Sequence, residues 1–238
     1  MIYFSTFTHR LSILIPIYMV ISFNSIKGGV GKSTLAVNMA AWLVKEGHDV
    51  LLVDGDEQET ASDFTAWREQ TLGQTGFTLV NMTGANLRKQ VEQMKPKYDH
   101  IVIDTGGRDT TSQRAALSVA DVAMIPFAPR SFDLWTINKV IEVIDEIQAI
   151  RNEPLVPYVF LSRADIKSAD NREVSQALAG FQQLNFLPYP ISNRKAFSNA
   201  AGVGLAVFET ETPDVKAVAE INALFNYVLN GSHITTTA

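Results

Sequence analysis

Residues 26–34 read IKGGVGKST, a glycine-rich stretch with two lysines and two hydroxyl side chains. A phosphate-binding loop needs these residue types: backbone N–H groups turn toward the anion, a lysine neutralises phosphate charge, and a serine hydroxyl ligates Mg²⁺. Lys32 and Ser33 fit the last two roles. The strict pattern G-x-x-x-x-G-K-[ST] fails, however, because Ile26 stands where its first glycine belongs. One phosphate-binding lysine also leaves Lys27 without a role.

Acidic side chains follow two later apolar runs and could complete such a site. VLLVDGDEQ places Asp54 and Asp56 after one run, and HIVIDTGG places Asp104 after another. Ligands of open parallel sheets collect at the carboxyl ends of the strands, so all three carboxylates can face the loop. A single aspartate after a strand is commonly a turn residue. Together with the glycine loop, the three favour a phosphoryl-transfer site.

The order of apolar runs and helical segments predicts the scaffold for these residues. Short runs rich in Val, Ile and Leu alternate with longer segments of helical period, which is typical of βα units. We therefore expect an α/β fold, doubly wound, with a mostly parallel β-sheet and helices on both faces. The expected strands are 20–26, 49–54, 77–81, 100–104, 121–126, 156–162 and 187–191. The expected helices are 33–46, 60–71, 86–95, 112–119, 132–150, 171–183 and 214–229.

The bulk composition excludes several classes of function. The 238 residues carry a net charge of −5, and 46% of them are hydrophobic, as in an ordinary globular protein. The chain has no cysteine, which excludes disulfides, thiolate metal sites and iron–sulfur clusters. Since the net charge is negative, any contact with nucleic acid must come from a local basic patch.

The segment LSILIPIYMVISF, at 11–23, is apolar. It is shorter than the roughly 20 residues of a membrane-spanning helix, and it runs directly into the strand that feeds the glycine loop. We interpret residues 1–18 as an N-terminal extension of unknown role, with Met19 as the hypothetical biological start. Residues 19–230 then form a single domain, followed by a polar tail at 231–238.

Four motifs in order resemble the deviant-Walker-A ATPases of the ParA/MinD family, most of all its small ParA-type members. They are KGGVGKST, LLVDGDEQ, IVIDTGGRD and PFAPRSFDLW, and the resemblance runs from Val20 to about Glu209. It implies a P-loop NTPase that binds ATP and Mg²⁺ and forms a face-to-face homodimer when ATP is bound. In that dimer the signature lysine, matched here by Lys27, crosses to the partner's phosphates.

The resemblance also implies roles for single residues. The expected catalytic residues are Lys27, Lys32 and Asp56, with Asp56 orienting the attacking water. The expected residues for Mg²⁺ are Ser33, Asp54 and Asp104. The expected contacts to ATP are Lys27, Gly28, Gly29, Val30, Gly31, Lys32, Ser33, Thr34 and Arg194.

The segment ISNRKAF, at 191–197, resembles the part of the family that lies near the adenine and contributes to nonspecific DNA binding after dimerisation. Arg194 and Lys195 are the candidates for that contact, although an ordinary exposed basic pair fits the sequence equally well. The strand end FLSRAD departs from the family, because Ser162 stands where asparagine is frequent. The departure leaves the adenine contacts open.

By resemblance, the function is that of a ParA-type positioning ATPase that is cytoplasmic and associated with the nucleoid. Its cargo would be a plasmid, a chromosome or a protein body such as a carboxysome, and a cargo-bound adaptor would stimulate hydrolysis. No membrane partner is expected, because the last helix shows a core-facing stripe rather than a basic amphipathic face. The alternative is a metabolic ATP-dependent ligase of the dethiobiotin-synthetase type, which needs neither DNA nor a signature lysine.

Overall fold

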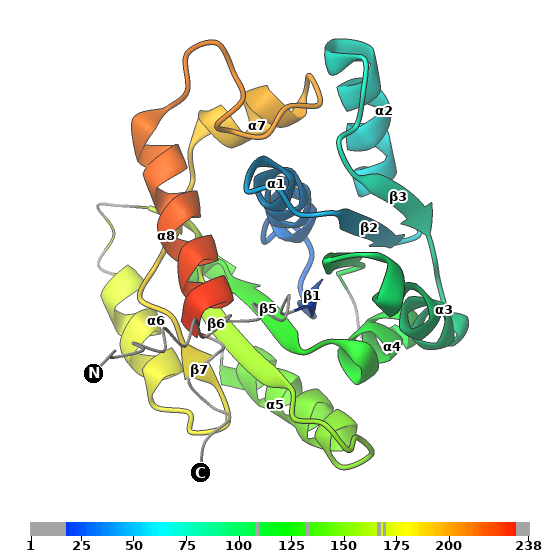
Figure 1. The fold of residues 1–238 in the computed structure, drawn as a ribbon. Helices are drawn as coiled ribbons and strands as arrows, with labels where there is room; N and C mark the ends of the chain where they lie inside the picture. The colour runs from blue at the N-terminus through cyan, green and yellow to red at the C-terminus, as the bar shows by residue number, and fades with distance from the viewer. Residues whose placement is uncertain (1–17, 108–109, 132–133, 166–167, 169, 232–238) are drawn as a thin grey trace, which may run out of the picture.

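The computed structural model describes residues 18–107, 110–131, 134–165, 168 and 170–231 (Figure 1). Within them, eight strands form one sheet in which every pairing is parallel. The strand order is β3-β2-β4-β1-β5-β6-β7, and β8 pairs with β6. The strands are β1 (Met19–Phe23), β2 (Val50–Gly55), β3 (Thr78–Asn81), β4 (His100–Thr105), β5 (Val122–Phe127), β6 (Val156–Ala164), β7 (Asn185–Phe186) and β8 (Ile191–Ser192).

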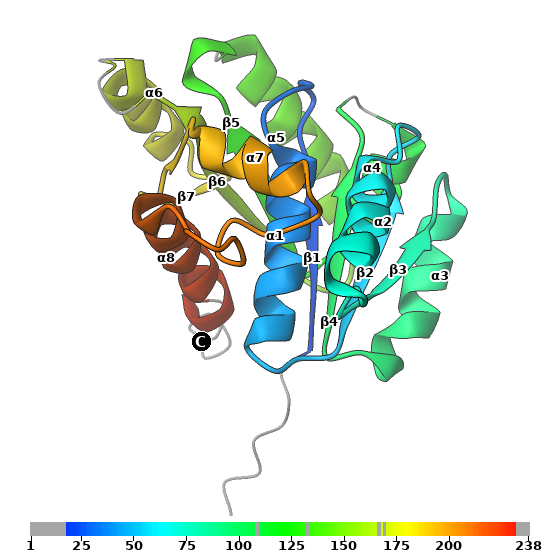
Figure 2. The ribbon, with the colours of Figure 1, turned by 90° about the horizontal axis from the view of Figure 1, so that it is seen from above.

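Helices connect these strands and confirm the expected doubly wound α/β architecture. The α-helices are α1 (Lys32–Lys45), α2 (Thr60–Leu72), α3 (Asn86–Met94), α4 (Thr111–Val119), α5 (Leu134–Gln148), α6 (Asp170–Ala179), α7 (Lys195–Ala201) and α8 (Val215–Gly231). Two 3₁₀ helices, η1 (Lys95–Lys97) and η2 (Pro129–Ser131), lie in connections. In Figure 2, α1 runs along β1, and α7 crosses near the N-terminal end of α1.

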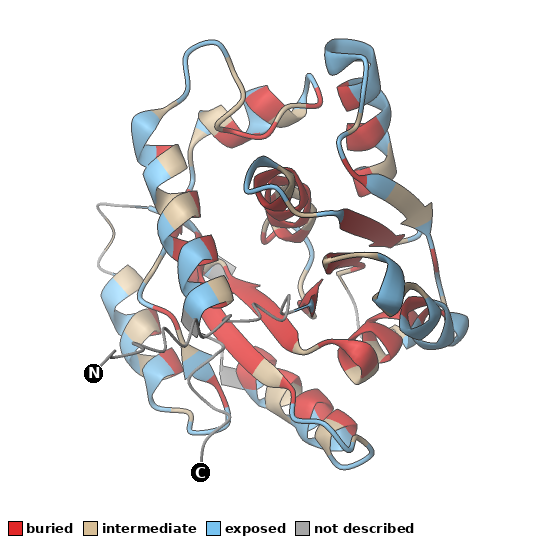
Figure 3. Cartoon of the chain, in the orientation of Figure 1, coloured by how far each residue is buried: buried red, intermediate tan, exposed pale blue. Residues whose placement is uncertain are grey.

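The two faces of the sheet carry separate hydrophobic cores. Ile21 and Phe23 point into the core shared with α1, α2, α7 and α8, whereas Val20 points into the core shared with α3, α4, α5 and α6. Successive strand residues face opposite sides, so a strand between two helical layers is apolar throughout. Figure 3 shows this burial pattern: the central strands are red, the edge strand β3 is tan, and the helices turn pale blue on their outer faces.

The last expected strand, 187–191, is wrong. The chain forms β7 and β8 instead, and both pair with β6 at separate positions. Pro188 and Pro190 lie between them, and proline has no N–H to give to a ladder, so one continuous strand is not possible there. The short helix α7, directly after β8, was missed by the sequence analysis.

Few residues of the expected N-terminal extension and C-terminal tail are among the described residues. The extension at 1–18 lies outside the described residues except for Tyr18, and the tail at 231–238 lies outside them except for Gly231. Met19 is buried and begins β1. The proposed boundaries therefore stay predictions. Among the described residues, no helix is long and apolar enough to cross a membrane.

Candidate functional site

A pocket of about 680 Å³ lies at the carboxyl edge of the sheet. One wall is the loop between β1 and α1 together with the first turn of α1, and the other walls follow β2, β4 and β6. The lining residues from the loop and α1 are Gly28, Gly29, Gly31, Lys32, Ser33 and Thr34. The remaining ones are Gly55, Asp56, Glu57, Gln58, Thr60, Gly106, Gly107, Thr110, Ser112 and Arg163.

Gly31 makes the turn from the loop into α1. Its φ of 95° lies in the left-handed region that side chains rarely adopt, and a Cβ there would lie 3.1 Å from Ser162 Oγ. Its carbonyl accepts a hydrogen bond from Leu35 N, the first of the helix. The free N–H groups and positive end of the α1 dipole therefore face the pocket, an arrangement that binds anions such as phosphate.

Lys32 lines the pocket with a buried side chain, and Asp104 is buried near it without lining the pocket. Burial lowers the pKa of Lys32, and the nearby carboxylates of Asp104 and Asp56 oppose that shift. Asp104 ends β4 with no exposed surface, and neither of its carboxylate oxygens has a hydrogen-bond partner of standard geometry. Burial raises its pKa to about 7, against the effect of the Ser33 hydroxyl. A carboxylate with unused oxygens beside a serine hydroxyl fits the oxygen ligands that Mg²⁺ prefers.

Asp54 and Asp56 have different surroundings although they are two residues apart. Asp56 lines the pocket, and its Oδ1 accepts a hydrogen bond from Gln58 N at 3.1 Å. Asp54 is buried outside the pocket wall. Its Oδ1 accepts from Asp56 N at 3.2 Å, and its Oδ2 accepts from Ser62 N and Ser62 Oγ at 2.9 and 2.7 Å. Asp54 therefore anchors the start of α2, and its expected metal role stays a prediction.

Two expected residues, Lys27 and Val30, lie beside the pocket and do not line it. Val30 buries its side chain, so only its backbone is available to a ligand. Lys27 is half-buried, and its backbone N donates to Ser25 Oγ at 3.1 Å. The loop packs tightly next to Lys27, since a Cβ on Gly107 would lie 2.9 Å from Gly28 Cα. The Lys27 side chain is thus next to the pocket of its own chain without forming its wall.

A second pocket, of about 370 Å³, adjoins the first. Three residues line both, namely Gly31, Thr34 and Arg163. Arg194 and Lys195 line the second pocket, next to the phosphate loop. Arg194 is only 16% exposed, and its Nε and Nη2 donate to Glu220 Oε1 at 3.1 and 2.7 Å. Since this pair occupies the Arg194 guanidinium, a contact from Arg194 to DNA stays a prediction, whereas Lys195 is exposed.

Arg163, which was not expected from the sequence, lines both pockets. Its φ of 54° is unusual for a side-chain-bearing residue, and the register of β6 against β8 shifts around it. Its Nη1 donates to the carbonyl of Gly29 at 2.6 Å, which ties β6 to the phosphate loop. The signal was present in FLSRAD, because a charged residue at the carboxyl end of a parallel strand faces the ligand edge.

Comparison with known proteins agrees with this geometry. The profile of the CobQ/CobB/MinD/ParA nucleotide binding domain matches residues 21–207. The chain belongs to this family. The expected resemblance to ParA and MinD is thereby confirmed, and the match covers the pocket, the sheet and the start of the last connection.

Proteins that resemble this chain in sequence or fold carry different names. "Maintenance of carboxysome distribution protein A" of Gloeobacter kilaueensis is 30% identical over 184 residues, which are 77% of this chain and 81% of that protein. A plasmid partition protein from Borrelia burgdorferi bound to AMPPNP has a TM-score of 0.71 at 19% identity, covering 90% and 99% of the chains. The structure of cobyrinic acid a,c-diamide synthase from Mycobacterium smegmatis, with bound ATP analog and magnesium, has a TM-score of 0.73 at 19% identity. The match covers 92% of this chain and 96% of that one. At 19% identity, both structures show the fold alone.

Proposed function

We propose that this protein is a Mg²⁺-dependent ATPase of the ParA type that positions a cellular cargo. The observation that carries the proposal is a pocket lined by the glycine loop, Lys32, Ser33 and Asp56, with the carboxylate of Asp104 buried next to Lys32 and Ser33. The carboxysome distribution protein of Gloeobacter kilaueensis, at 30% identity, supports the positioning role. A carboxysome-like body or a plasmid is the corresponding cargo here.

The residues in and near the pocket have different roles in phosphoryl transfer. The loop N–H groups and Lys32 hold the phosphates, while the second pocket is continuous with the first and has room for the nucleoside. Ser33 and Asp104 would hold Mg²⁺, which when bound neutralises charge on the phosphates. Asp56 faces the same pocket and positions the attacking water.

The position of Lys27 supports a role across a dimer. Lys27 neighbours the phosphate loop but does not line the pocket of its own chain. In an ATP-bound homodimer, its ammonium group serves the phosphates of the facing subunit. Hydrolysis then requires the dimer. The dimer contacts DNA nonspecifically at Lys195 and neighbouring surfaces. A cargo-bound adaptor stimulates ATP turnover on the nucleoid.

A second candidate function is that of an ATP-dependent ligase. It is favoured by the fold shared with cobyrinic acid a,c-diamide synthase at a TM-score of 0.73. Such an enzyme activates a second substrate and has no use for Lys27 or for DNA. Turnover that needs a metabolite and does not depend on dimerisation would favour it over the positioning ATPase.

The Asp56→Ala variant tests the proposed function. We expect it to bind ATP and accumulate as a DNA-binding dimer, while kcat falls by about 10²- to 10⁴-fold because the water is no longer positioned. Gel filtration and DNA binding, each with and without ATP and Mg²⁺, measure the outcome. Asp63→Ala, an exposed aspartate on α2, is the matched control. Normal turnover would overturn the role of Asp56, and absence of both ATP-dependent dimer and DNA binding would favour the ligase.

A further inference from the structure

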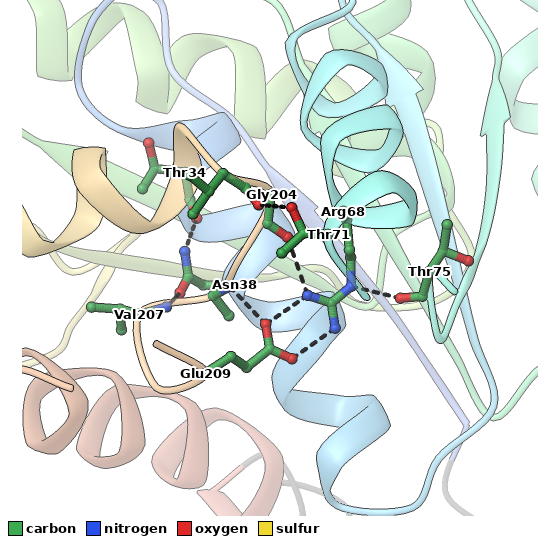
Figure 4. A network of polar contacts seen from close by, with 10 residues as sticks. Thr34, Asn38, Arg68, Thr71, Thr75, Gly204, Val207 and Glu209 are labelled. Carbon is green, nitrogen blue, oxygen red and sulfur yellow. Dashed lines mark hydrogen bonds and ion pairs between the residues drawn. The ribbon is translucent and has the colours of Figure 1, made fainter. Parts of the chain in front are cut away.

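Residues 202–209, here called the strap, lead from α7 toward α8 and contact α2 through a partly buried ion pair (Figure 4). Arg68 of α2 is only 4% exposed. Its Nη1 and Nη2 donate to Oε2 and Oε1 of Glu209 at 2.6 and 2.7 Å, and its Nε donates to the carbonyl of Thr75 at 2.6 Å. A two-pronged, charge-assisted contact of this kind holds both partners in one geometry.

The backbone of the strap lies directly against the backbone of α2. Gly204 has a φ of 69°, and a Cβ there would collide with the backbone N of Arg68. The carbonyl of Val203 accepts a hydrogen bond from Thr71 Oγ1 at 2.8 Å, one turn further along α2. The strap therefore requires glycine at 204 for reasons of both conformation and close approach.

The strap is also attached to the phosphate-binding helix α1. Asn38 of α1 is 1% exposed, and its Oδ1 accepts a hydrogen bond from Val207 N at 2.9 Å. Its Nδ2 donates to the carbonyl of Thr34 at 2.7 Å, and Thr34 lines both pockets. Glu209 Oε2 also accepts a hydrogen bond from Ala206 N at 2.7 Å, so the polar contacts of α1 and those of α2 meet at neighbouring residues of the strap (Figure 4).

The helix α2 depends on such attachments because its apolar anchor is small. Its buried residues are Ala61, Phe64, Thr65 and Arg68, of which only two are apolar. The turn before it contains Glu59 with a φ of 52°, a conformation that persists only where the surroundings hold it. The backbone carbonyl of Asp56 accepts a hydrogen bond from Glu59 N at 3.1 Å. A shift of α2 would therefore be transmitted through this turn to Asp56.

We propose that Arg68 and Glu209 are positioning residues for ATP hydrolysis. The pair fixes α2 relative to α1 through the strap, and thereby keeps Asp56 where the attacking water must be held. The inference rests on the proposed ATPase function and names residues that lie outside the pocket lining. It also explains why a charged pair with a buried arginine stands at this junction, where apolar side chains would pack without directional contacts.

The test is a comparison of ATP binding and turnover in Glu209→Gln. The variant keeps the size of the side chain but loses its charge, so α2 loosens while the phosphate loop is unchanged. We expect kcat to fall by about 10- to 100-fold, as for a small misplacement of a catalytic group, with ATP affinity changed by less than about threefold. Glu92→Gln is the control, since it breaks the exposed Arg88–Glu92 pair on α3.

A second pair of variants separates the strap from general effects of folding. Gly204→Ala displaces the strap from α2, whereas Gly47→Ala, at a φ of 94° with open space around it, carries only the conformational strain. Hydrogen exchange of the α2 amides, measured below the onset of unfolding, should accelerate in Glu209→Gln and Gly204→Ala alone. Absence of turnover in the wild type would contradict the proposed function. An active wild type with unchanged kcat in both strap variants, or with binding and turnover lost in parallel, would overturn this inference.

Discussion

A Lys27→Ala variant is expected to bind ATP and to hydrolyse it about 10³- to 10⁵-fold more slowly than the wild type, the range that a cation supplied across an interface contributes to phosphoryl transfer. At about 1.36 kcal/mol per decade, the loss corresponds to roughly 4–7 kcal/mol of transition-state stabilisation. Binding survives because Lys27 does not line the pocket of its own chain, whereas Lys32 does. Single-turnover hydrolysis and nucleotide titration measure the two effects, with the exposed Lys89→Ala as control.

A mixture of two inactive variants decides whether Lys27 acts across the dimer. In a mixed dimer of Lys27→Ala with Asp56→Ala, one site combines the intact Asp56 of one subunit with the intact Lys27 of the other. Random pairing in equal amounts should then restore about one active site in four, given a symmetric dimer. If Lys27 acts within its own chain, the mixture stays inactive. Full activity of Lys27→Ala alone would contradict the role and favour the ligase.

An Asp104→Asn variant is expected to be more stable than the wild type at pH 8 without Mg²⁺, although it is inactive. Burial raises the pKa of Asp104 from 3.8 to about 7, so the folded state binds this proton more tightly than the unfolded state does. Asp104 therefore stabilises the folded wild type only when it is protonated: its contribution is fully present below about pH 4 and is lost as the pH rises through about 7. This rise in the pKa corresponds to roughly 4 kcal/mol of stability, which the variant would retain at pH 8 because its side-chain amide carries no charge.

Urea unfolding of both proteins between pH 4 and 8 measures this difference. His100 also contributes to the pH dependence of stability, and its contribution must be removed from the comparison. Burial lowers the pKa of His100 to about 4, which makes the free energy of unfolding rise with pH over about the same range. Subtracting the free energy of unfolding of the wild type from that of Asp104→Asn at each pH leaves the Asp104 contribution. Mg²⁺ with ATP should stabilise the wild type at pH 8 and not the variant. Parallel pH profiles would contradict the assignment.

Local patterns predicted most strands and the phosphate loop, and they failed where pairing partners decide the structure. The boundaries of β2 and β4 were close to the expected 49–54 and 100–104, because a strand buried on both faces is a continuous apolar run. The expected strand at 187–191 was wrong, since β6 offers separate positions to β7 and β8. The seven-residue helix α7 was missed because so short a segment carries almost no helical period.

In the candidate site, too, local sequence predicted some features and the packing of the fold decided others. The types and order of Gly31, Lys32, Asp56 and Asp104 sufficed to predict a phosphate-binding pocket, because its chemistry lies in short segments that end neighbouring strands. The resemblance assigned Asp56 to the attacking water and Asp54 to Mg²⁺, but nothing in those segments indicated that Asp54 would bind Ser62 at the start of α2 while Asp56 lines the pocket. That distinction depends on where Ser62 lies after the helix has packed.

The sequence by itself determined the family, the strand-loop-helix unit that holds phosphate, and the presence of an additional lysine at position 27. Only the tertiary structure decided that Arg163 reaches Gly29, that Arg68 pairs with Glu209, and that Asp104 is fully buried with unused oxygens. The physical reason is the range of the forces involved. Loop conformation and helix initiation are set by adjacent residues, whereas burial and ion pairing depend on segments that meet only after the sheet and its helices have packed.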